Sequence, residues 1–346
     1  MPEIAGVNVR GPVRTCRHEL SEWDEDHQVW KPAFGLTIVT FRPDGQVIDG
    51  DSHNPDGSIS RWANAYDAEG RVVEQRWWKD GEPTSTSIQT YDGQGRPTGQ
   101  MEIAPDGTKR ETETCSYDSS GRRTKKTFLP SLSTTNVSYG VEGSRQAYGA
   151  PGASVMATSY DELGRPAQAI FQDANHAVVR RVTFTRDEAG RVLAESVEFG
   201  EAPPFPDALT GAGGVPSEYR AKMATLLAEV FANQTFSTTT YAYDSEGRVV
   251  ARITRMGNLS EDRTTFRYND RDDLIEEIDE HQSRGANLDD HGVMQATDER
   301  SHTSQTRYEY QYDEHGNWTE RIVWSRHDSQ SDFRRSNLIR RAISYY

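Results

Sequence analysis

Two short stretches of the chain place acidic residues beside a histidine, the combination from which metal and acid–base sites are built. One is Asp24-Glu25-Asp26-His27, and the other is Asp289-Asp290-His291, with His281 a few residues before it. Carboxylate and imidazole groups suit divalent ions, but a single cluster of this kind more often forms a solvated loop. The second cluster also has few apolar anchors around it, so a precise site would be hard to hold. We predict no catalytic residue and no metal ligand in either stretch.

Aspartate also recurs at the start of a short motif, at Asp67, Asp92, Asp118, Asp161, Asp187, Asp244 and Asp313. Glycine-rich repeats that bind calcium carry their acids at a much shorter period. An aspartate at the start of a turn can instead accept hydrogen bonds from the backbone N–H groups of that turn. We therefore assign these residues a structural role and predict no cofactor.

No motif of a known catalytic class is present: the chain lacks GxSxG, HExxH, a P-loop and a dinucleotide fingerprint. Carboxylates are numerous, however, and a pair at glycosidase spacing could form in the concavity of a sheet. We predict that the protein is not an enzyme. A hydrolase acting on a polysaccharide is the alternative.

Five tryptophans in or beside predicted strands are the candidate ligand-binding residues: Trp62, Trp77, Trp78, Trp318 and Trp324. Exposed aromatic rings on a sheet stack on sugars or receive side chains of a protein partner. The competing interpretation is that they fill a core that is short of aliphatic side chains.

The composition argues against several classes of binding partner. The 346 residues carry a formal charge of −15, which argues against nucleic acid. No apolar run reaches the roughly 18 residues that a spanning helix needs, so we expect no membrane insertion. The two cysteines, Cys16 and Cys115, are too few for a disulfide framework or a four-thiolate zinc site. They are interpreted as partly buried thiols, with a single bridge between them as the alternative.

The strands and turns that must position these residues are predicted by a repeated sequence motif. YDSEGRVVARITR from Tyr243 joins a type I turn, Asp244 to Gly247, to an alternating strand. Near-complete copies begin at Tyr66, Tyr91, Tyr117 and Tyr160. Glycine accepts the left-handed conformation that closes such a turn. The arginine after each glycine is expected to pair with turn acids of neighbouring units.

The turn glycines from Gly45 to Gly121 are separated by 12, 13, 11, 14, 12 and 14 residues, and an apolar or aromatic residue usually stands four positions before each. One strand and one tight turn fill such a step, which predicts an antiparallel meander. Asn175 is expected to replace glycine after Phe171, and the turn after Tyr268, with Asp272 at the glycine position, is expected to be weaker or reshaped.

Three segments depart from the repeat. Residues 1–40 form an N-terminal, cap-like segment that leads into a strand from Leu36 to Phe41. Residues 200–235 open with a Pro- and Gly-rich loop and continue into SEYRAKMATLLAEVFANQ, whose apolar spacing predicts a helix. Residues 280–306 form a polar insertion, interpreted as a long loop or a frayed hairpin.

The motif YD-x-x-G-R-V at a spacing near 25 residues resembles the YD repeat of the RHS family of bacterial proteins and of the related teneurin shells. The resemblance covers about Phe41 to Val323. It implies a long β-sheet coiled into a spiral, which in large members closes as a hollow shell around a toxin domain, and it implies an envelope or secreted location. This chain is several-fold shorter than those members and shows no DPxG-type self-cleavage signature, no toxin domain after Tyr312 and no signal peptide.

We therefore predict an all-β fold in a single domain over residues 1–346. Antiparallel YD-repeat hairpins form a curled or spiral sheet with one helix-bearing insertion. The predicted function is a non-catalytic, RHS-like scaffold or binding module that holds a protein partner or a glycan on the curved sheet. A polysaccharide hydrolase and a remnant of a toxin-encapsulating shell are the alternatives.

Overall fold

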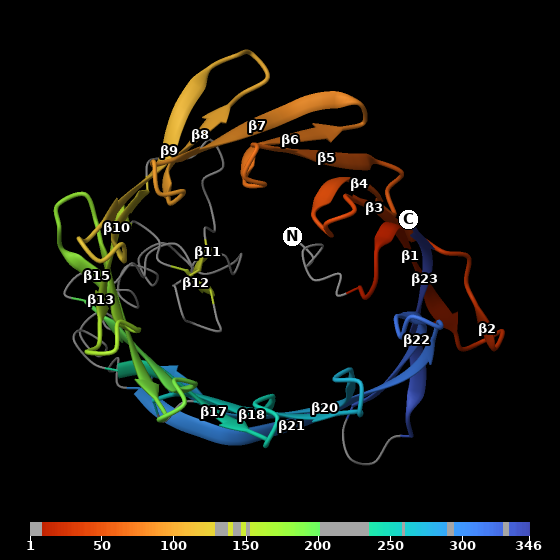
Figure 1. Cartoon of the computed structure of the whole chain (residues 1–346). Coiled ribbons are helices and arrows are strands. Elements are labelled where there is room, and N and C mark those ends of the chain that lie inside the picture. The colour runs from red at the N-terminus through yellow and green to blue at the C-terminus, as the bar shows by residue number, and fades with distance from the viewer. Residues whose placement is uncertain are drawn as a thin grey trace.

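The chain forms a ring of strands, seen along its axis in Figure 1. The structure is a computed structural model, and it describes residues 9–128, 138–140, 147–149, 153–200, 235–257, 260–288, 294–327 and 332–346. Every regular element in these ranges is a β-strand. The described residues therefore contain no helix long and apolar enough to cross a membrane.

The strands of the first half are β1 (Val13–Asp24), β2 (Val29–Trp30), β3 (Gly35–Phe41), β4 (Val47–His53), β5 (Ile59–Tyr66), β6 (Val72–Lys79), β7 (Glu82–Tyr91), β8 (Pro97–Ile103), β9 (Lys109–Tyr117), β10 (Arg123–Phe128), β11 (Ser138–Gly140) and β12 (Ala147–Gly149). Those of the second half are β13 (Val155–Tyr160), β14 (Pro166–Gln172), β15 (Val178–Arg186), β16 (Val192–Phe199), β17 (Thr235–Tyr243), β18 (Val249–Met256), β19 (Ser260–Tyr268), β20 (Leu274–Leu288), β21 (Met294–Tyr312), β22 (Trp318–His327) and β23 (Arg334–Tyr345).

The ring closes because its first and last strands pair with each other. In β1, Cys16 lies opposite Val39 of β3 on one side and opposite Ile343 of β23 on the other. Of the 21 strands in the described sheet, β2 pairs only with β1, and the other 20 form a closed antiparallel barrel. The all-β, antiparallel part of the prediction is confirmed, but the curled or spiral sheet is wrong. Pairing between the two ends of a chain leaves no mark on local sequence patterns, and it removes the exposed edges that a spiral would keep.

Each YD motif builds its turn with the same contacts. Gly70 N donates to Asp67 O at 3.1 Å, and Asp67 N donates to Arg71 O at 3.0 Å. The Asp67 carboxylate accepts from Glu69 N and Arg71 N. The predicted positive φ is confirmed at the glycines of the five near-complete copies of the motif, where φ lies between 74° and 82°. These glycines are Gly70, Gly95, Gly121, Gly164 and Gly247. A one-residue register shift, as at Ala65 and Tyr66, accompanies such a turn.

Two turns use another residue at the glycine position. The prediction that Asn175 takes it is wrong, because His176 has the positive φ of 64° and donates its N–H to Asp173 O. The turn at Tyr268 keeps its shape despite the absence of glycine: Asp272 has φ 65° and donates its N–H to Asn269 O at 3.2 Å.

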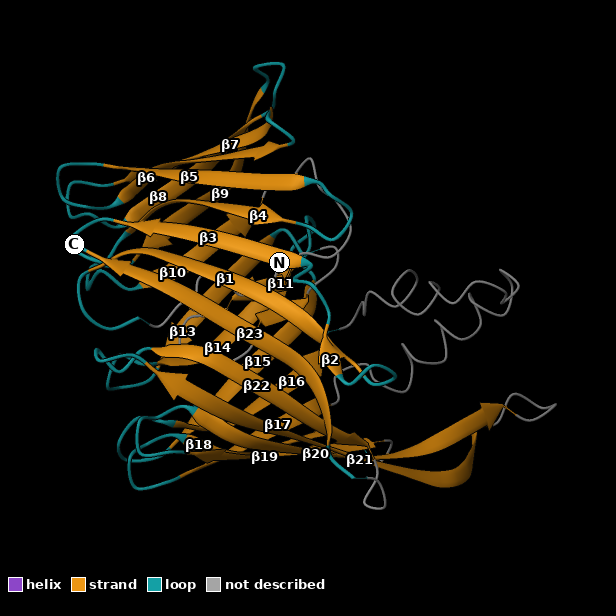
Figure 2. Cartoon of the chain, turned by 90° about the vertical axis from the view of Figure 1, so that its right-hand side faces the viewer, coloured by secondary structure: helices purple, strands orange, loops and turns teal. Residues whose placement is uncertain are grey.

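Successive turns alternate between the two ends of the barrel, so the YD turns all gather at one rim. Figure 2 shows this rim, with the C-terminus, opposite a rim from which the hairpin β20–β21 projects. We call these the YD rim and the far rim. The described residues of the segment 280–306 belong to that hairpin, with Glu280 paired to Thr303. The helix predicted within 200–235 lies outside the described residues, and no described residue is helical.

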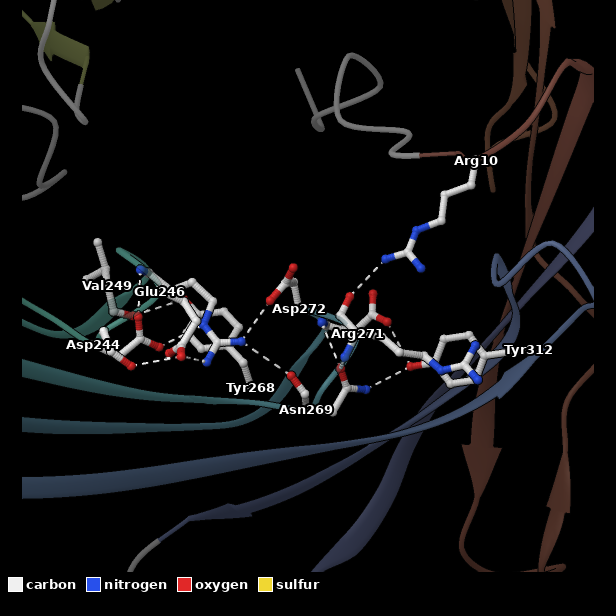
Figure 3. Close-up of polar contacts among 12 residues, drawn as sticks. Arg10, Asp244, Glu246, Val249, Tyr268, Asn269, Arg271, Asp272 and Tyr312 are labelled. Carbon is white, nitrogen blue, oxygen red and sulfur yellow. Dashed lines mark hydrogen bonds and ion pairs between the residues drawn. The ribbon is translucent and has the colours of Figure 1, made fainter.

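At the YD rim, tyrosine and arginine link each turn to the next. The guanidinium carbon of Arg71 lies 4.8 Å from the ring centroid of Tyr91, while Arg71 Nε donates to Asp67 Oδ2 of its own turn at 2.6 Å. The expected pairing with an acid of the neighbouring turn occurs at Arg248 and Asp272, 2.7 Å apart. At the other YD turns described, the aspartate partner belongs to the arginine's own turn. Figure 3 shows the links around Tyr268 and Tyr312.

Candidate functional site on the inner face of the ring

The side chains of the ring divide between an inner and an outer face, and Figure 3 identifies the inner one. Tyr268 and Tyr312 lie on the side of their strands that faces the interior of the ring. Tyr310 and Tyr308 precede Tyr312 at every second position of β21, with ring centroids 5.9 Å and 6.5 Å apart in series. Because alternate residues of a strand share a face, Tyr308 and Tyr310 are inner-face residues too.

The tryptophans predicted to bind a ligand do not form one strip. Register places three on the inner face and two on the outer face: Trp62, Trp77 and Trp318 inside, and Trp78 and Trp324 outside. Trp62 packs over Gly50 so closely that a Cβ there would lie 2.1 Å from the indole. Trp62 therefore fills the core, which was the competing interpretation.

Trp318 is the centre of a compact group of cationic and aromatic side chains. The guanidinium carbon of Arg341 lies 3.3 Å from the Trp318 ring centroid, and that of Arg321 lies 5.0 Å away. The rings of Tyr310 and His18 lie 6.2 Å and 6.1 Å from the same indole. We call these five residues the Trp318 cluster. They come from β1, β21, β22 and β23, so the closure of the ring assembles the cluster.

A bulge at Thr319 brings Trp318 and Arg321 onto the same face although they are three positions apart. Tyr312 pairs with Trp318, but its neighbour Gln311 pairs with Glu320, so one residue of β22 is passed over. The extra residue reverses the alternation of the strand. Without it, Arg321 would point outward, and Arg341 of β23 would be the one cationic neighbour of Trp318 left in the cluster.

Part of the hydrogen-bonding capacity of the cluster is unused. Nε and Nη1 of Arg341 and Nε of Arg321 are buried, and none of them donates to a described residue. Burial, with the nearby charge of Arg321, lowers the pKa of Arg341 to about 10. A buried guanidinium is costly unless an acceptor takes its N–H groups. The cluster is therefore suited to bind an anion.

Cys16 and His18 lie beside the cluster but do not form a nucleophilic pair. Cys16 Sγ is 3.2 Å from His18 Nε2. Burial raises the pKa of Cys16 to about 11, and burial together with the charges of Arg341 and Arg321 lowers the pKa of His18 to about 4. Near pH 7 both groups are neutral, whereas such a pair works as thiolate and imidazolium. Both Cys16 and Cys115 are free thiols, so the alternative of a bridge between them is wrong.

The opposite part of the inner face is apolar. Its buried residues come from β10 and β13–β17: Phe128, Met156, Ala169, Phe171, Val182, Phe184, Val192, Val197 and Tyr241. The hairpin β11–β12 lies inside the ring in Figure 1. A buried apolar cluster and the half-buried Trp318 cluster thus occupy different parts of the same inner face.

A pocket on the outer face is lined by two carboxylates and a tryptophan, residue types that the hydrolase alternative would use. Asp51 and Asp80 lie there with Trp78 and Arg61. Asp80 Oδ1 accepts from Ile59 N at 2.7 Å, and Asp51 lies 3.7 Å from Arg61 Nε. Each acid is therefore engaged by the fold, and the pair lies on the outer face rather than in a sheet concavity.

The acid–histidine stretches give no shared site in the part of the chain that is described. His27 Nδ1 lies 3.0 Å from Asp24 Oδ2, and Asp24 Oδ1 accepts from His27 N, so this stretch closes its own turn. His281 pairs with Asp262 on exposed strands. Among the described residues no group of three potential metal ligands comes together. The predictions for Asp289, Asp290 and His291 fall outside the described residues.

Sequence reasoning missed His18, Arg321 and Arg341, because it weighed the arginines that recur with the motif and not those that occur once. The only local signal was the arginine-containing alternation before the C-terminus, RRAISYY. Which face these residues occupy depends on the bulge at Thr319 and on the pairing of β1 with β23.

No protein-family model and no curated protein sequence matches the chain. Among solved structures, the chain is similar to the complex described as TcdB2-TccC3-Cdc42, at 11% identity and a TM-score of 0.37, covering 92% of this chain and 18% of that one. It is also similar to a porin-like protein from Bacteroides uniformis, at 10% identity and a TM-score of 0.32, covering 97% and 98%. At TM-scores this low, neither likeness carries an argument about function.

Two predictions are revised at this point. The class of protein is an all-β repeat barrel, which agrees with the coarse architecture implied by the RHS resemblance but not with its spiral form. The prediction of no membrane insertion is corrected as well. It rested on the length of apolar runs, a criterion that applies to helices, and the closed ring of strands removes that basis.

Proposed function

We propose that this protein is a non-catalytic, RHS-like scaffold that holds a polypeptide partner inside its closed ring of strands. The observation that carries the proposal is the make-up of the inner face. One part is an apolar cluster over β10 and β13–β17 that is already buried within the chain, and another part is the half-buried Trp318 cluster. Cationic and aromatic anchors of the second kind are enriched in protein-binding surfaces.

A protein partner fits this surface better than a glycan does. The five tryptophans named as candidate sugar-stacking residues do not share one face, because Trp78 and Trp324 lie on the face opposite to Trp62, Trp77 and Trp318. Trp62 is also committed to packing over Gly50. The hairpin β11–β12, which lies within the ring, indicates that the interior accommodates polypeptide.

The absence of catalysis is part of the proposal. The Cys16–His18 contact is neutral near pH 7, and the acids of the outer pocket serve as hydrogen-bond and ion-pair partners of the fold. Purified protein is therefore expected to turn over no glycosidase, esterase or peptidase substrate. Hydrolysis that alanine at Asp51 or Asp80 abolishes would replace the scaffold with an enzyme.

Two adjacent positions of β21 allow a direct test of the inner face. Tyr308 shares the inner face with Tyr310 and Tyr312, and Glu309, at the intervening position, is exposed on the outer face. A photo-crosslinking phenylalanine analogue is placed at either position, and the full chain is irradiated in the cells that produce it. We expect one defined polypeptide to be captured from position 308 and not from position 309.

The paired design makes each outcome decisive. Capture from position 308 alone supports a partner held in the ring. Capture from both positions equally, or from position 309 alone, would place any partner on the outer surface and contradict the proposal. Absence of capture from position 308, with the variant folded by circular dichroism, contradicts it as well.

A further inference from the structure

We propose that the Trp318 cluster binds a carboxylate, supplied by an aspartate or glutamate side chain of the polypeptide that the ring holds. This inference rests on the proposed function and deepens it by naming the chemistry that the inner face recognises. The groups that bind are the half-buried guanidiniums of Arg341 and Arg321, in which Nε and Nη1 of Arg341 and Nε of Arg321 have no acceptor among the described residues. Trp318 keeps both guanidiniums in place by stacking.

The charges around the cluster leave these donors available. Asp273 acts on Arg341 electrostatically, but its Oδ2 accepts from the Tyr312 hydroxyl at 2.7 Å. Within the described residues neither Arg321 nor Arg341 forms a salt bridge, in contrast to the arginines of the YD turns. The positive charge of Arg321 also repels that of Arg341 and adds to the lowering of the Arg341 pKa by burial. An anion within reach of the two guanidiniums would weaken this repulsion and accept hydrogen bonds that no described residue accepts.

The number and kind of the donors favour a carboxylate over a phosphate. Arginine is planar and matches the planar carboxylate, and hydrogen bonds between the two ions are among the strongest in proteins. Sites for phosphate commonly add backbone N–H groups to their side chains. In this cluster the Tyr310 hydroxyl donates to Leu274 O at 2.7 Å, so it adds no free donor. His18, with its lowered pKa, adds no positive charge near pH 7.

The apolar side of the cluster explains why a side chain fits better than a free ion. The indole of Trp318 is only half-buried. A glutamate brings methylene groups that can pack on this indole while its carboxylate meets the arginines. Aspartate and glutamate on a strand or turn inside the ring could reach the site in this way.

The test uses a defined probe and a matched control variant. Acetyl-tetraglutamate amide is titrated into the full-length protein by calorimetry, with acetyl-tetraglutamine amide, acetate and inorganic phosphate in parallel. Arg341→Gln removes an inner-face guanidinium, and Arg340→Gln removes the neighbouring one, which pairs with Glu320 on the outer face. We expect Arg341→Gln to lower the affinity for the glutamate peptide by roughly tenfold or more. Arg340→Gln is expected to leave this affinity unchanged.

Thermal unfolding separates a binding role from a structural one. Because Nε and Nη1 of Arg341 are buried without an acceptor among the described residues, Arg341→Gln is expected to keep or raise the Tm of the free protein, while the upward Tm shift caused by the glutamate peptide disappears. Equal binding to wild type and Arg341→Gln overturns the inference, and so does phosphate binding in the absence of peptide binding. A lowered Tm in Arg341→Gln with no peptide binding to the wild type would mean that the arginine is structural.

The two proposals can fail separately. If a polypeptide is captured from position 308 but Arg341→Gln does not change the affinity for the peptide, the scaffold proposal stands and the carboxylate site is rejected. Peptide binding that depends on Arg341 without capture from position 308 retains a carboxylate site and rejects the enclosed partner.

Discussion

The guanidinium of Arg71 lies over the ring of Tyr91, 4.8 Å from its centroid, and the Tyr91 hydroxyl donates to Val72 O at 2.8 Å. Each YD unit is thus joined to the previous one by two contacts, the stacking of arginine on tyrosine and the tyrosine hydrogen bond. The same hydroxyl-to-carbonyl bond recurs at Tyr66, Tyr117, Tyr160, Tyr243 and Tyr268. The accepting carbonyl lies beside the bulge of the earlier hairpin, where the ladder is disrupted. The motif is therefore a device that joins repeats along the YD rim.

These two contacts predict that two substitutions of Tyr91 lower stability by different amounts. Tyr91→Phe removes only the hydroxyl and leaves Val72 O with one acceptor bond fewer, at a cost of about 1 kcal/mol. Tyr91→Leu also removes the stacking with Arg71 and should cost more. Urea unfolding of the two variants measures both steps. Equal stability of wild type and Tyr91→Phe would show that the hydroxyl bond adds nothing.

Two glycines in YD turns separate backbone strain from steric contact. Gly247 has φ 82°, and a Cβ there would meet nothing within 4 Å. Gly247→Ala should therefore destabilise the protein by about 1 kcal/mol through its backbone conformation alone. Gly93 also has open space around it but lies outside the left-handed region. Gly93→Ala should be neutral or slightly stabilising, and a loss as large as that of Gly247→Ala would contradict this explanation.

His176 offers the converse test, because a non-glycine residue holds the left-handed position there with φ 64°. His176→Gly should raise the free energy of unfolding by up to about 1 kcal/mol, since it relieves strain that a Cβ imposes. Asn175→Gly, one position earlier, relieves no such strain and should lower stability through the greater entropy of the unfolded chain. Chemical denaturation compares the two variants. The opposite order of stabilities would restore Asn175 as the residue that replaces glycine.

His18 gives the barrel a pH dependence with a defined sign. Burial, followed by the charges of Arg341 and Arg321, lowers its folded-state pKa to about 4, while an unfolded histidine titrates near 6.5. Between these values the unfolded chain binds more protons, so stability is fully present above about pH 6.5 and falls as the pH drops towards 4. His18→Phe should flatten the stability curve over this interval. Parallel curves for wild type and variant, measured by Tm, would mean that His18 is not desolvated.

Local sequence determined the hairpins of this protein. Aspartate at the start of the turn and glycine at its end act within five residues of each other, and so does the pairing of Arg71 with Asp67. Such contacts are the same in any tertiary context, so the all-β fold, the antiparallel order and the positive φ of the YD glycines could all be predicted. Leu36 to Phe41 was also recognised as a strand, which the structure extends by one residue to Gly35.

Tertiary structure decided what depends on distant pairing. The closed ring exists because β1 and β23, at opposite ends of the sequence, have complementary edges, and no local pattern records this. The same closure brings His18 to Arg341, and the bulge at Thr319 turns Arg321 inward beside Trp318. A one-residue change of register moves a side chain to the other face of a sheet. For this reason five tryptophans could be named from the sequence, but only the assembled barrel separated Trp318, with its two cationic neighbours, from the other four.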